Sequence, residues 1–143
     1  MVRSVTWGLL GFLAGVVTAL ALVIGVEVFS SVVHPFPADF DQSHEQVCEH
    51  VRRYPGWVLA VVIPLWSATA GLSSWIARRL GGWIPAALVA ALCLAAVALN
   101  LSMLPYPQWF KVLMPVGMLL AGWWGCGRFR KSHAAMPGES ETA

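Results

Sequence analysis

Four long apolar segments constrain this chain more than any other feature of its sequence. They cover about residues 5–33, 57–77, 83–104 and 109–124, and a helix of about 20 residues crosses a hydrocarbon core of about 30 Å. Because backbone groups in lipid must be hydrogen-bonded internally, each segment is expected to be a transmembrane helix. Charged residues make up only 11% of the chain, which is typical of membrane proteins. The sequence predicts an all-α fold, a four-transmembrane-helix bundle over residues 1–131.

The distribution of basic residues predicts how this bundle is oriented. Six lie on one side of the predicted membrane and three on the other. The first group is Arg3, Arg78, Arg79, Arg128, Arg130 and Lys131, and the second is Arg52, Arg53 and Lys111. By the positive-inside rule, both termini are expected in the cytoplasm of a bacterial cell, with the bundle in the inner (plasma) membrane.

The two ends of the chain carry separate expectations. Arg3, the apolar run behind it and the triplet Ala19-Leu20-Ala21 resemble a signal peptide with its cleavage site. The apolar run continues well beyond Ala21, so an uncleaved first helix is expected. Residues 132–143 are short and polar, and are expected to form a disordered cytoplasmic tail.

The loop between the first two apolar segments is predicted to contain a short amphipathic helix, about residues 43–54. Ser43 stands three residues before Gln46, which is the capping-box pattern at the start of a helix. One side of this helix is apolar and the other charged, and a Glu49–Arg53 pair at i,i+4 is favourable. The apolar side is Val47, Val51 and Tyr54, and the charged side is Glu45, Glu49, Arg52 and Arg53. Such a helix is expected on the outer membrane face or over the mouth of the bundle.

Small residues recur at four-residue spacing on the predicted helices. Gly11 and Gly15 form a GxxxG pattern, and Gly117 and Ala121 continue to Gly125 in the fourth segment. The third segment repeats the same spacing with alanines, Ala87, Ala91 and Ala95. Small residues let helix backbones approach closely in lipid, where packing drives association. These faces are expected either to pack the four helices together or to bind a second copy or a membrane-protein partner.

Glu27 is the one carboxylate inside an apolar segment, and an ionisable group there is by default a functional hypothesis. The roughly 20 residues from Trp7 to Glu27 span about 30 Å, which places Glu27 near the outer membrane boundary. The same count from Trp83 places Asn100 at a similar depth. Glu27, His34 and Asn100 are therefore predicted to share an outer polar layer that binds an ion or proton. The alternatives are an interfacial Glu27 and a plain interhelical hydrogen bond from Asn100.

His44 and Cys48 are the weak candidates for a metal site. They stand one helical turn apart, a spacing that can place an imidazole and a thiolate on one metal ion. Neither an HxxxH nor a paired-cysteine spacing accompanies them, and His50 points to another side of the helix. Solvated loop residues are therefore the expectation, with no metal site.

Other functional classes find little support in the sequence. There is no nucleophile elbow, phosphate-binding loop or dinucleotide fingerprint, so no enzymatic activity and no cofactor are expected. A net charge of +2 is too small to indicate a nucleic-acid partner. The lipid bilayer is the expected environment of the chain.

Three short motifs carry a resemblance to a known group of proteins. They are Glu27 with His34-Pro35-Phe36-Pro37, Tyr54-Pro55, and Asn100-Leu101 followed by Pro105-Tyr106-Pro107-Gln108-Trp109-Phe110. Together they resemble a group of small, uncharacterised bacterial four-helix integral membrane proteins with a Glu in the first helix. The resemblance spans about residues 23–124, and it implies the fold and the outer polar layer without implying an activity.

A weaker similarity is to small multidrug-resistance transporters, which also have four helices and a Glu in the first one. The stretch Ile24-Gly25-Val26-Glu27-Val28 is loosely like their Glu motif. In this chain the Glu lies near the outer end of its helix, and a long loop replaces a tight turn. These departures argue against a drug-antiport mechanism.

Two functional hypotheses follow from the sequence. The first is a non-enzymatic structural or accessory membrane protein that assembles through its small-residue helix faces. The second is a small proton- or cation-linked transporter or channel in which Glu27 binds the ion, supported by His34 and Asn100.

Overall fold

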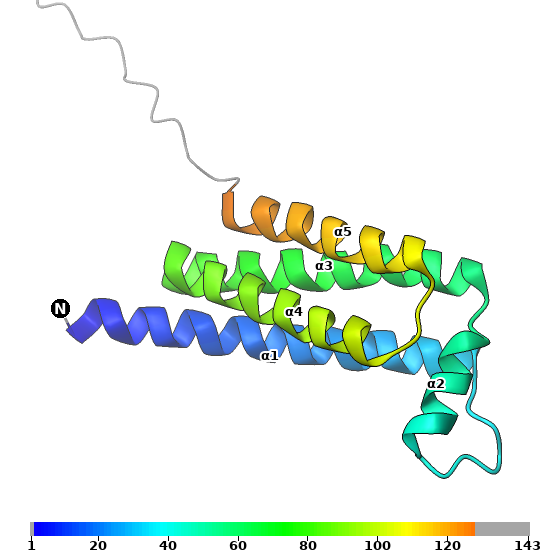
Figure 1. Cartoon of the computed structure of the whole chain (residues 1–143). Coiled ribbons are helices and arrows are strands. Elements are labelled where there is room, and N and C mark those ends of the chain that lie inside the picture. The colour runs from blue at the N-terminus through cyan, green and yellow to red at the C-terminus, as the bar shows by residue number, and fades with distance from the viewer. Residues whose placement is uncertain (1, 128–143) are drawn as a thin grey trace, which may run out of the picture.

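The computed structural model describes residues 2–127, with side-chain environments from residue 5 onward, and these residues form five α-helices and no strand. The helices are α1 (Val2–Val33), α2 (His44–Arg52), α3 (Gly56–Gly81), α4 (Trp83–Met103) and α5 (Gln108–Gly127) (Figure 1). The predicted all-α fold with four long apolar helices and one short loop helix is confirmed. The expected tail, residues 132–143, lies outside the described residues.

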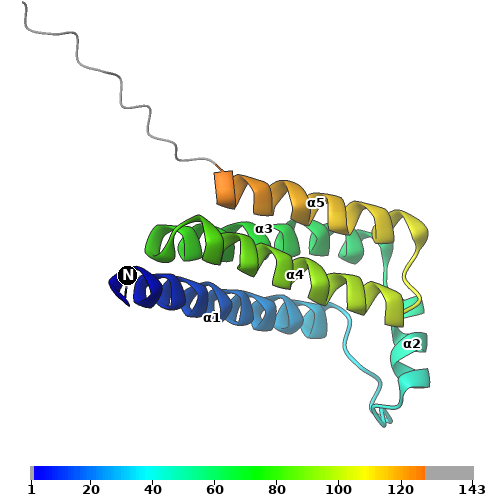
Figure 2. The same cartoon turned by 60° about the vertical axis from the view of Figure 1, so that its left-hand side comes forward.

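Consecutive long helices run antiparallel to each other, with α3 at the centre of the bundle. Helix α3 packs against α1, α4 and α5, and α4 also contacts α1 and α5. Helices α1 and α5 lie on opposite sides of this arrangement, as both views show (Figures 1 and 2). Both ends of the described chain lie at one end of the bundle, and α2 lies at the other (Figure 1).

Helix α3 occupies the centre because small residues line it. Its buried residues between positions 69 and 77 are Thr69, Ala70, Gly71, Ser73, Ser74 and Ala77. The hydroxyl of Ser73 donates to the carbonyl oxygen of Thr69 at 2.6 Å, within the helix itself. The hydroxyls of Thr69 and Ser73 are satisfied in this way within their own helix, whereas the buried Ser74 hydroxyl has no hydrogen-bond partner among the described residues. All three act here as small packing residues. The sequence analysis did not single out this polar stripe.

Glycine contacts bring α1 against α3. A Cβ atom added at Gly11 would lie 2.5 Å from the backbone nitrogen of Gly81. One added at Gly15 would lie 2.8 Å from both the Ala77 Cβ and a methyl group of Val89 on α4. Only glycine fits at these two positions, because a side chain would overlap the neighbouring helix.

Helix α5 meets α3 in the same manner on the other side. A Cβ at Gly117 would lie 2.6 Å from the Ser67 hydroxyl, and one at Gly125 would lie 2.5 Å from the Gly71 carbonyl oxygen. The carbonyl oxygen of Ala121 is also close to Gly71. Two uses were expected for the small-residue faces: packing within the chain, or binding of a second copy or partner. The glycine faces of α1 and α5 pack against α3 within one chain.

The bundle ends differ from the sequence expectation by a few residues. The second long helix was expected to end at residue 77, but α3 continues through Arg78 and Arg79 to Gly81. The chain reverses at Gly82, whose φ of 91° is a left-handed conformation that favours glycine. The guanidinium of Arg79 lies over the Trp75 ring, 4.9 Å from its centroid. This cation–π contact gives the charged last turn of α3 an aromatic partner within the same helix.

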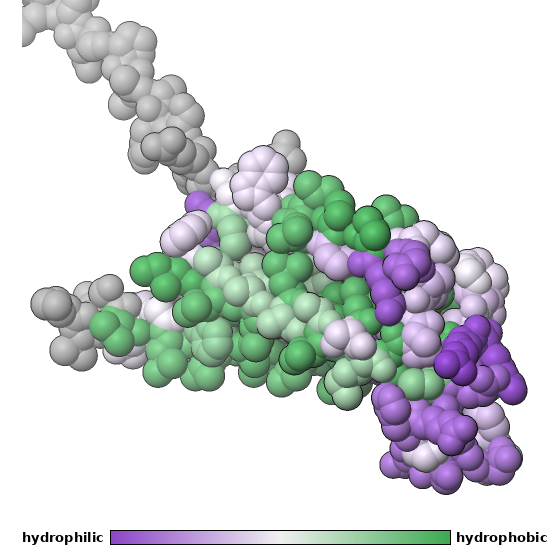
Figure 3. Space-filling view, viewed as in Figure 1, coloured by the Kyte–Doolittle hydropathy of each residue, from purple (hydrophilic) through white to green (hydrophobic). Residues whose placement is uncertain are grey.

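The surface of the bundle is apolar. Large side chains point outward along all four long helices, as on α1 with Leu13, Val17, Leu20, Ile24 and Val28. Figure 3 shows this apolar surface over the bundle and a hydrophilic surface over the α2 end. All four long helices are long and apolar enough to cross a membrane. Outward-facing apolar residues of this kind fit lipid rather than water, so the chain is a multi-pass membrane protein.

We expect Gly11→Ala to destabilise the bundle, whereas Gly25→Ala should not. The new Cβ at position 11 meets the Gly81 backbone, and such overpacking typically costs about 1–3 kcal/mol. Nothing lies within 4 Å of a Cβ at Gly25, which is exposed on the same helix. Both changes add the same helix propensity, so the difference between their melting temperatures in detergent isolates the crossing contact. Equal melting temperatures for the two variants would contradict this packing.

Candidate binding cavity beneath the loop helix

A cavity of about 170 Å³ lies in the bundle at the α2 end. All five helices and the connection between α4 and α5 contribute to its walls. The apolar lining includes Leu59, Val62, Val97, Leu101 and Met114. The polar and aromatic lining includes Glu27, Asn100, His50, Tyr54, Trp66 and Tyr106. Because apolar walls converge with a few polar groups here, this cavity is the principal candidate site in the described part of the chain.

Glu27 from α1 and Asn100 from α4 line this same cavity. Both residues are exposed, so the cavity opens to the surface of the bundle beside them. His34 lies just beyond the end of α1 and shares a neighbouring groove with Glu27, Ser30 and Tyr54. The structure thus places Glu27 with Asn100 in one space and Glu27 with His34 in the next, at the same end of the bundle.

Two tyrosines bring hydroxyl groups to the cavity from segments outside the long helices. The Tyr54 side chain shares a hydrogen bond with Ser30, and burial raises the pKa of its phenol. Burial raises the pKa of Tyr106 to about 12, and the nearby Tyr54 and Glu27 add to this effect. Both phenols therefore stay protonated at neutral pH and face the cavity as neutral hydroxyl groups. Sequence reasoning had placed Tyr54 on the apolar side of the loop helix and had used both tyrosines as motif residues, but it had assigned neither to a binding site.

Helix α2 begins as the sequence predicts. The backbone N–H of Gln46 donates to the Ser43 hydroxyl, while the Gln46 side-chain oxygen accepts from the N–H of Asp41. The carboxylate of Asp41 in turn accepts from the N–H of Ser43 at 2.8 Å. The hydrogen bond with the Ser43 side chain, first, and the one from the Ser43 backbone N–H, second, lower the pKa of Asp41. The capping network fixes the start of the helix, and with it the direction of its two faces.

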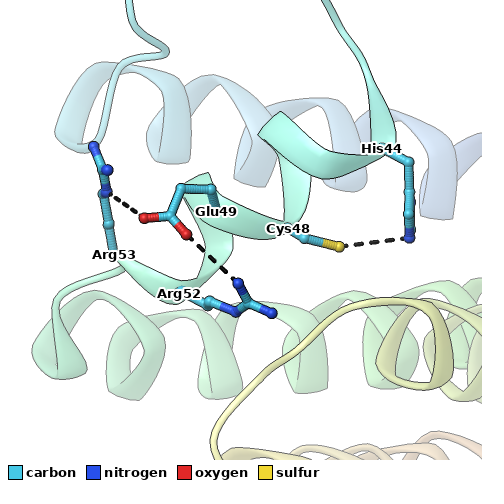
Figure 4. Close-up of polar contacts among 5 residues, drawn as sticks. All are labelled: His44, Cys48, Glu49, Arg52 and Arg53. Carbon is cyan, nitrogen blue, oxygen red and sulfur yellow. Dashed lines mark hydrogen bonds and ion pairs between the residues drawn. The ribbon is translucent and has the colours of Figure 1, made fainter.

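The charged face of α2 points away from the bundle. Glu49 accepts a hydrogen bond from Arg53 at 2.9 Å and lies 3.6 Å from Arg52 (Figure 4). All three side chains are about half exposed or more, so these ion pairs contribute at most about 1 kcal/mol each. The Glu49–Arg53 pair is confirmed, and it leaves the opposite side of α2 to form a wall of the cavity.

His44 and Cys48 do lie together on this outer side. The Cys48 sulfur is 3.5 Å from the His44 Nε2 (Figure 4). Within residues 2–127, no group of three or more His, Cys, Asp or Glu residues is placed to hold a metal ion. The pair therefore supplies two possible ligands, fewer than the three or four protein ligands of a zinc site.

His50 is the site residue that sequence reasoning missed. It is buried, with 7% of its surface exposed, and lines the cavity beside Val51. Its position follows from helical spacing, because residues 47, 50, 51 and 54 fall on one side of a helix. The pattern Val47–Val51–Tyr54 identified this face, and His50 belongs to it by the same period.

Comparison with protein-family models, with curated proteins and with solved structures finds no match to this chain. The resemblance to small bacterial four-helix membrane proteins therefore stays a prediction. The function must be argued from the cavity itself.

We expect the Ser30–Tyr54 hydrogen bond to stabilise the α2 end of the bundle. Ser30→Ala or Tyr54→Phe should each cost about 0.5–1.5 kcal/mol, and the double variant little more than one of them. Ser31→Ala is the matched control, because the exposed Ser31 hydroxyl donates only to the Val28 carbonyl of its own helix. Thermal unfolding of the wild type, the two single variants and the double variant in detergent measures the coupling. Strictly additive losses would mean that the two side chains do not interact.

Proposed function

We propose that this membrane protein binds a proton or a small cation at Glu27, within the cavity beneath α2, as part of a small transporter or channel. The observation that carries the proposal is the meeting of Glu27 and Asn100, from two different helices, in one aromatic-walled cavity. Glu27 is the one carboxylate inside an apolar segment, and ionisable residues within transmembrane helices commonly mark ion or proton sites.

The chemistry of the walls favours a cation over an anion. Glu27 supplies a carboxylate, and Asn100 and the two tyrosines supply oxygen atoms that can face a cation. The Trp66 ring adds an aromatic surface that attracts positive charge. The described lining contains no arginine or lysine, so within residues 2–127 no permanent positive charge opposes cation binding there.

The size of the cavity limits the ligand. A cavity of about 150 Å³ holds a molecule as large as benzene, whereas drug-sized ligands occupy about 300–1,000 Å³. At about 170 Å³, this cavity suits a proton carried on Glu27, a partly hydrated metal cation or a very small organic cation. With both termini in the cytoplasm, as the positive-inside rule predicts, the site would open toward the outer face.

We expect Glu27→Gln to abolish a proton- or cation-dependent flux in proteoliposomes, because the amide removes the charge and keeps the shape. The loss should be at least about tenfold, with helical content and melting temperature unchanged. Glu45→Gln is the control, because Glu45 lies on the exposed side of α2 outside the cavity. Flux is measured with a pH-sensitive dye inside the vesicles and with isotopic sodium or potassium. A purified protein that moves no ion, or a Glu27→Gln variant with full flux, would refute the proposal.

A second candidate is an accessory protein that assembles with a second copy of itself. The small-residue faces at Gly11, Gly15, Gly117 and Ala121 are occupied inside the chain, but Ala91 and Ala95 are exposed on α4. This alanine face has the spacing that helix pairs use in lipid.

We expect Ala91→Phe to reduce the apparent mass of the assembly in detergent if this candidate function holds. Ala96→Phe is the matched control, because it makes the same change at an exposed position on another side of α4. Size-exclusion chromatography with light scattering measures the mass. Under this function Glu27→Gln should have no effect, and a wild-type protein that is monomeric at all concentrations would exclude it.

A further inference from the structure

Four aromatic side chains form a stacked cluster that joins α2 to the end of α1. His34 follows directly after α1, where its backbone N–H donates to the Ser30 carbonyl oxygen at 2.8 Å. Its ring stacks on the His50 ring of α2, with 4.3 Å between the centroids and 25° between the planes. Phe36 stacks on His50 at 4.2 Å, and Phe40 stacks on Phe36 at 4.2 Å. The stack therefore ties the middle of α2 to the segment that leaves α1.

Both histidines keep one ring nitrogen away from water and without a hydrogen bond. The Nε2 atoms of His34 and His50 are buried and have no partner among the described residues. The His50 ring has a hydrogen bond with the backbone of His34, which leaves its Nε2 as a lone-pair acceptor in the neutral form. A neutral imidazole tolerates this environment, because an unpaired acceptor costs far less than an unpaired charge.

Protonation changes the character of this stack. A proton on the His50 Nε2 would place a positive charge in a side chain that is only 7% exposed. The new N–H donor would have no acceptor among the described residues. Burial, first, and the adjacent His34, second, lower the pKa of His50 from its ordinary value of 6.5. The folded stack thus binds fewer protons than the free side chain does. The stack therefore stabilises the folded state fully above about pH 6.5, and this stabilisation is lost as the pH falls below that value.

The groups that face the pair come from several elements. His34 faces His50 from the end of α1, and the Tyr54 ring stands edge-on to it at 5.3 Å. Glu27 from α1 and Tyr106 from the α4–α5 connection line the cavity together with His50. Glu27 carries the one carboxylate in this cavity, and it also lines the groove that holds His34.

The stack holds a wall of the cavity in place. His50, Val51 and Phe36 all line the cavity, so a displacement of α2 would open it toward the α2 end. Glu49 pairs with Arg52 and Arg53 on the opposite, exposed side of α2, so these ion pairs do not tie the helix to the bundle. Its position depends on the aromatic stack and on the buried side chain of Val51.

We propose that His34 and His50 form a proton-binding site that latches α2 over the cavity, closed when both rings are neutral and released when the pair takes up a proton. The ligand is the proton itself, and Glu27 is the carboxylate positioned to pair with the imidazolium once the stack has opened. The latch does not depend on cation binding at Glu27, so it stands or falls separately from the proposed transport function.

Hydrogen exchange of the full chain in lipid nanodiscs tests this latch between about pH 5 and pH 8. After correction for the intrinsic pH dependence of exchange, we expect the amides of residues 44–54 to lose protection at least tenfold as the pH falls from about 7.5 to 5. The amides of α3 should keep theirs. His50→Phe should preserve the stack and remove this pH dependence, whereas His44→Phe, on the exposed side of the same helix, should retain it.

Three results would overturn the latch: equal protection at both pH values in the wild type, an unchanged pH response in His50→Phe, or a His50 that titrates at 6.5 or above by NMR. If residues 44–54 of His50→Phe are unprotected at every pH, that variant no longer reports on the pH response. The protection of residues 44–54 at the two pH values is then compared in His34→Phe instead. A His34→Phe variant that keeps the full pH response would then refute the paired site, and one that loses it would support it. A wild-type protein without ion flux would leave the latch intact.

Discussion

The close approach of helix backbones to α3 is the constraint on which the rest of the structure depends. Apolar side chains gain little when they leave lipid for a helix interface, because lipid tails are equally apolar. Helices in a membrane therefore associate where small residues allow many short contacts. Gly11 against Gly81, and Gly125 against Gly71, provide such contacts on two sides of the same helix. Helix α3 can therefore serve as the common partner of α1, α4 and α5, and it sets where the other three helices lie.

The same packing explains why the cavity lies at one end of the bundle. Gly11, Gly15 and Gly81 bring α1 and α3 together at the end of the bundle opposite α2. Toward α2 the facing residues become large and aromatic, as with Trp66 and Tyr106. Large rings hold helices further apart than glycines do, and flat rings fill the extra space incompletely. A bundle that is tight at one end and aromatic at the other thus leaves room for a ligand beside Glu27.

Much of the fold could be predicted from the sequence, because segment length and hydropathy determine a membrane helix almost locally. Rise per residue was also sufficient to bring Glu27 and Asn100 to one depth, and both line one cavity. The choice of partner for Gly11 could not be predicted, because a small-residue face fits a neighbouring helix or a second copy equally well. The burial of His50 was missed for another reason: a histidine in a polar loop is usually solvated, whereas here the rings of His34, Phe36 and Tyr54 cover it.

Helix α2 differs from the other helices in what holds it. The four long helices are fixed by backbone approaches that no change of protonation can alter, whereas α2 is fixed through side chains of which two can take up a proton. Elements held by few contacts open at lower free energy than the core does, so a change at α2 need not disturb the bundle. Because α2 also forms a wall of the Glu27 cavity, the most weakly held helix is the one that closes the cavity toward the α2 end. A proton reaching this end of the molecule would then meet the histidine pair and the carboxylate in adjoining spaces, which couples the opening of the cavity at the α2 end with its charge.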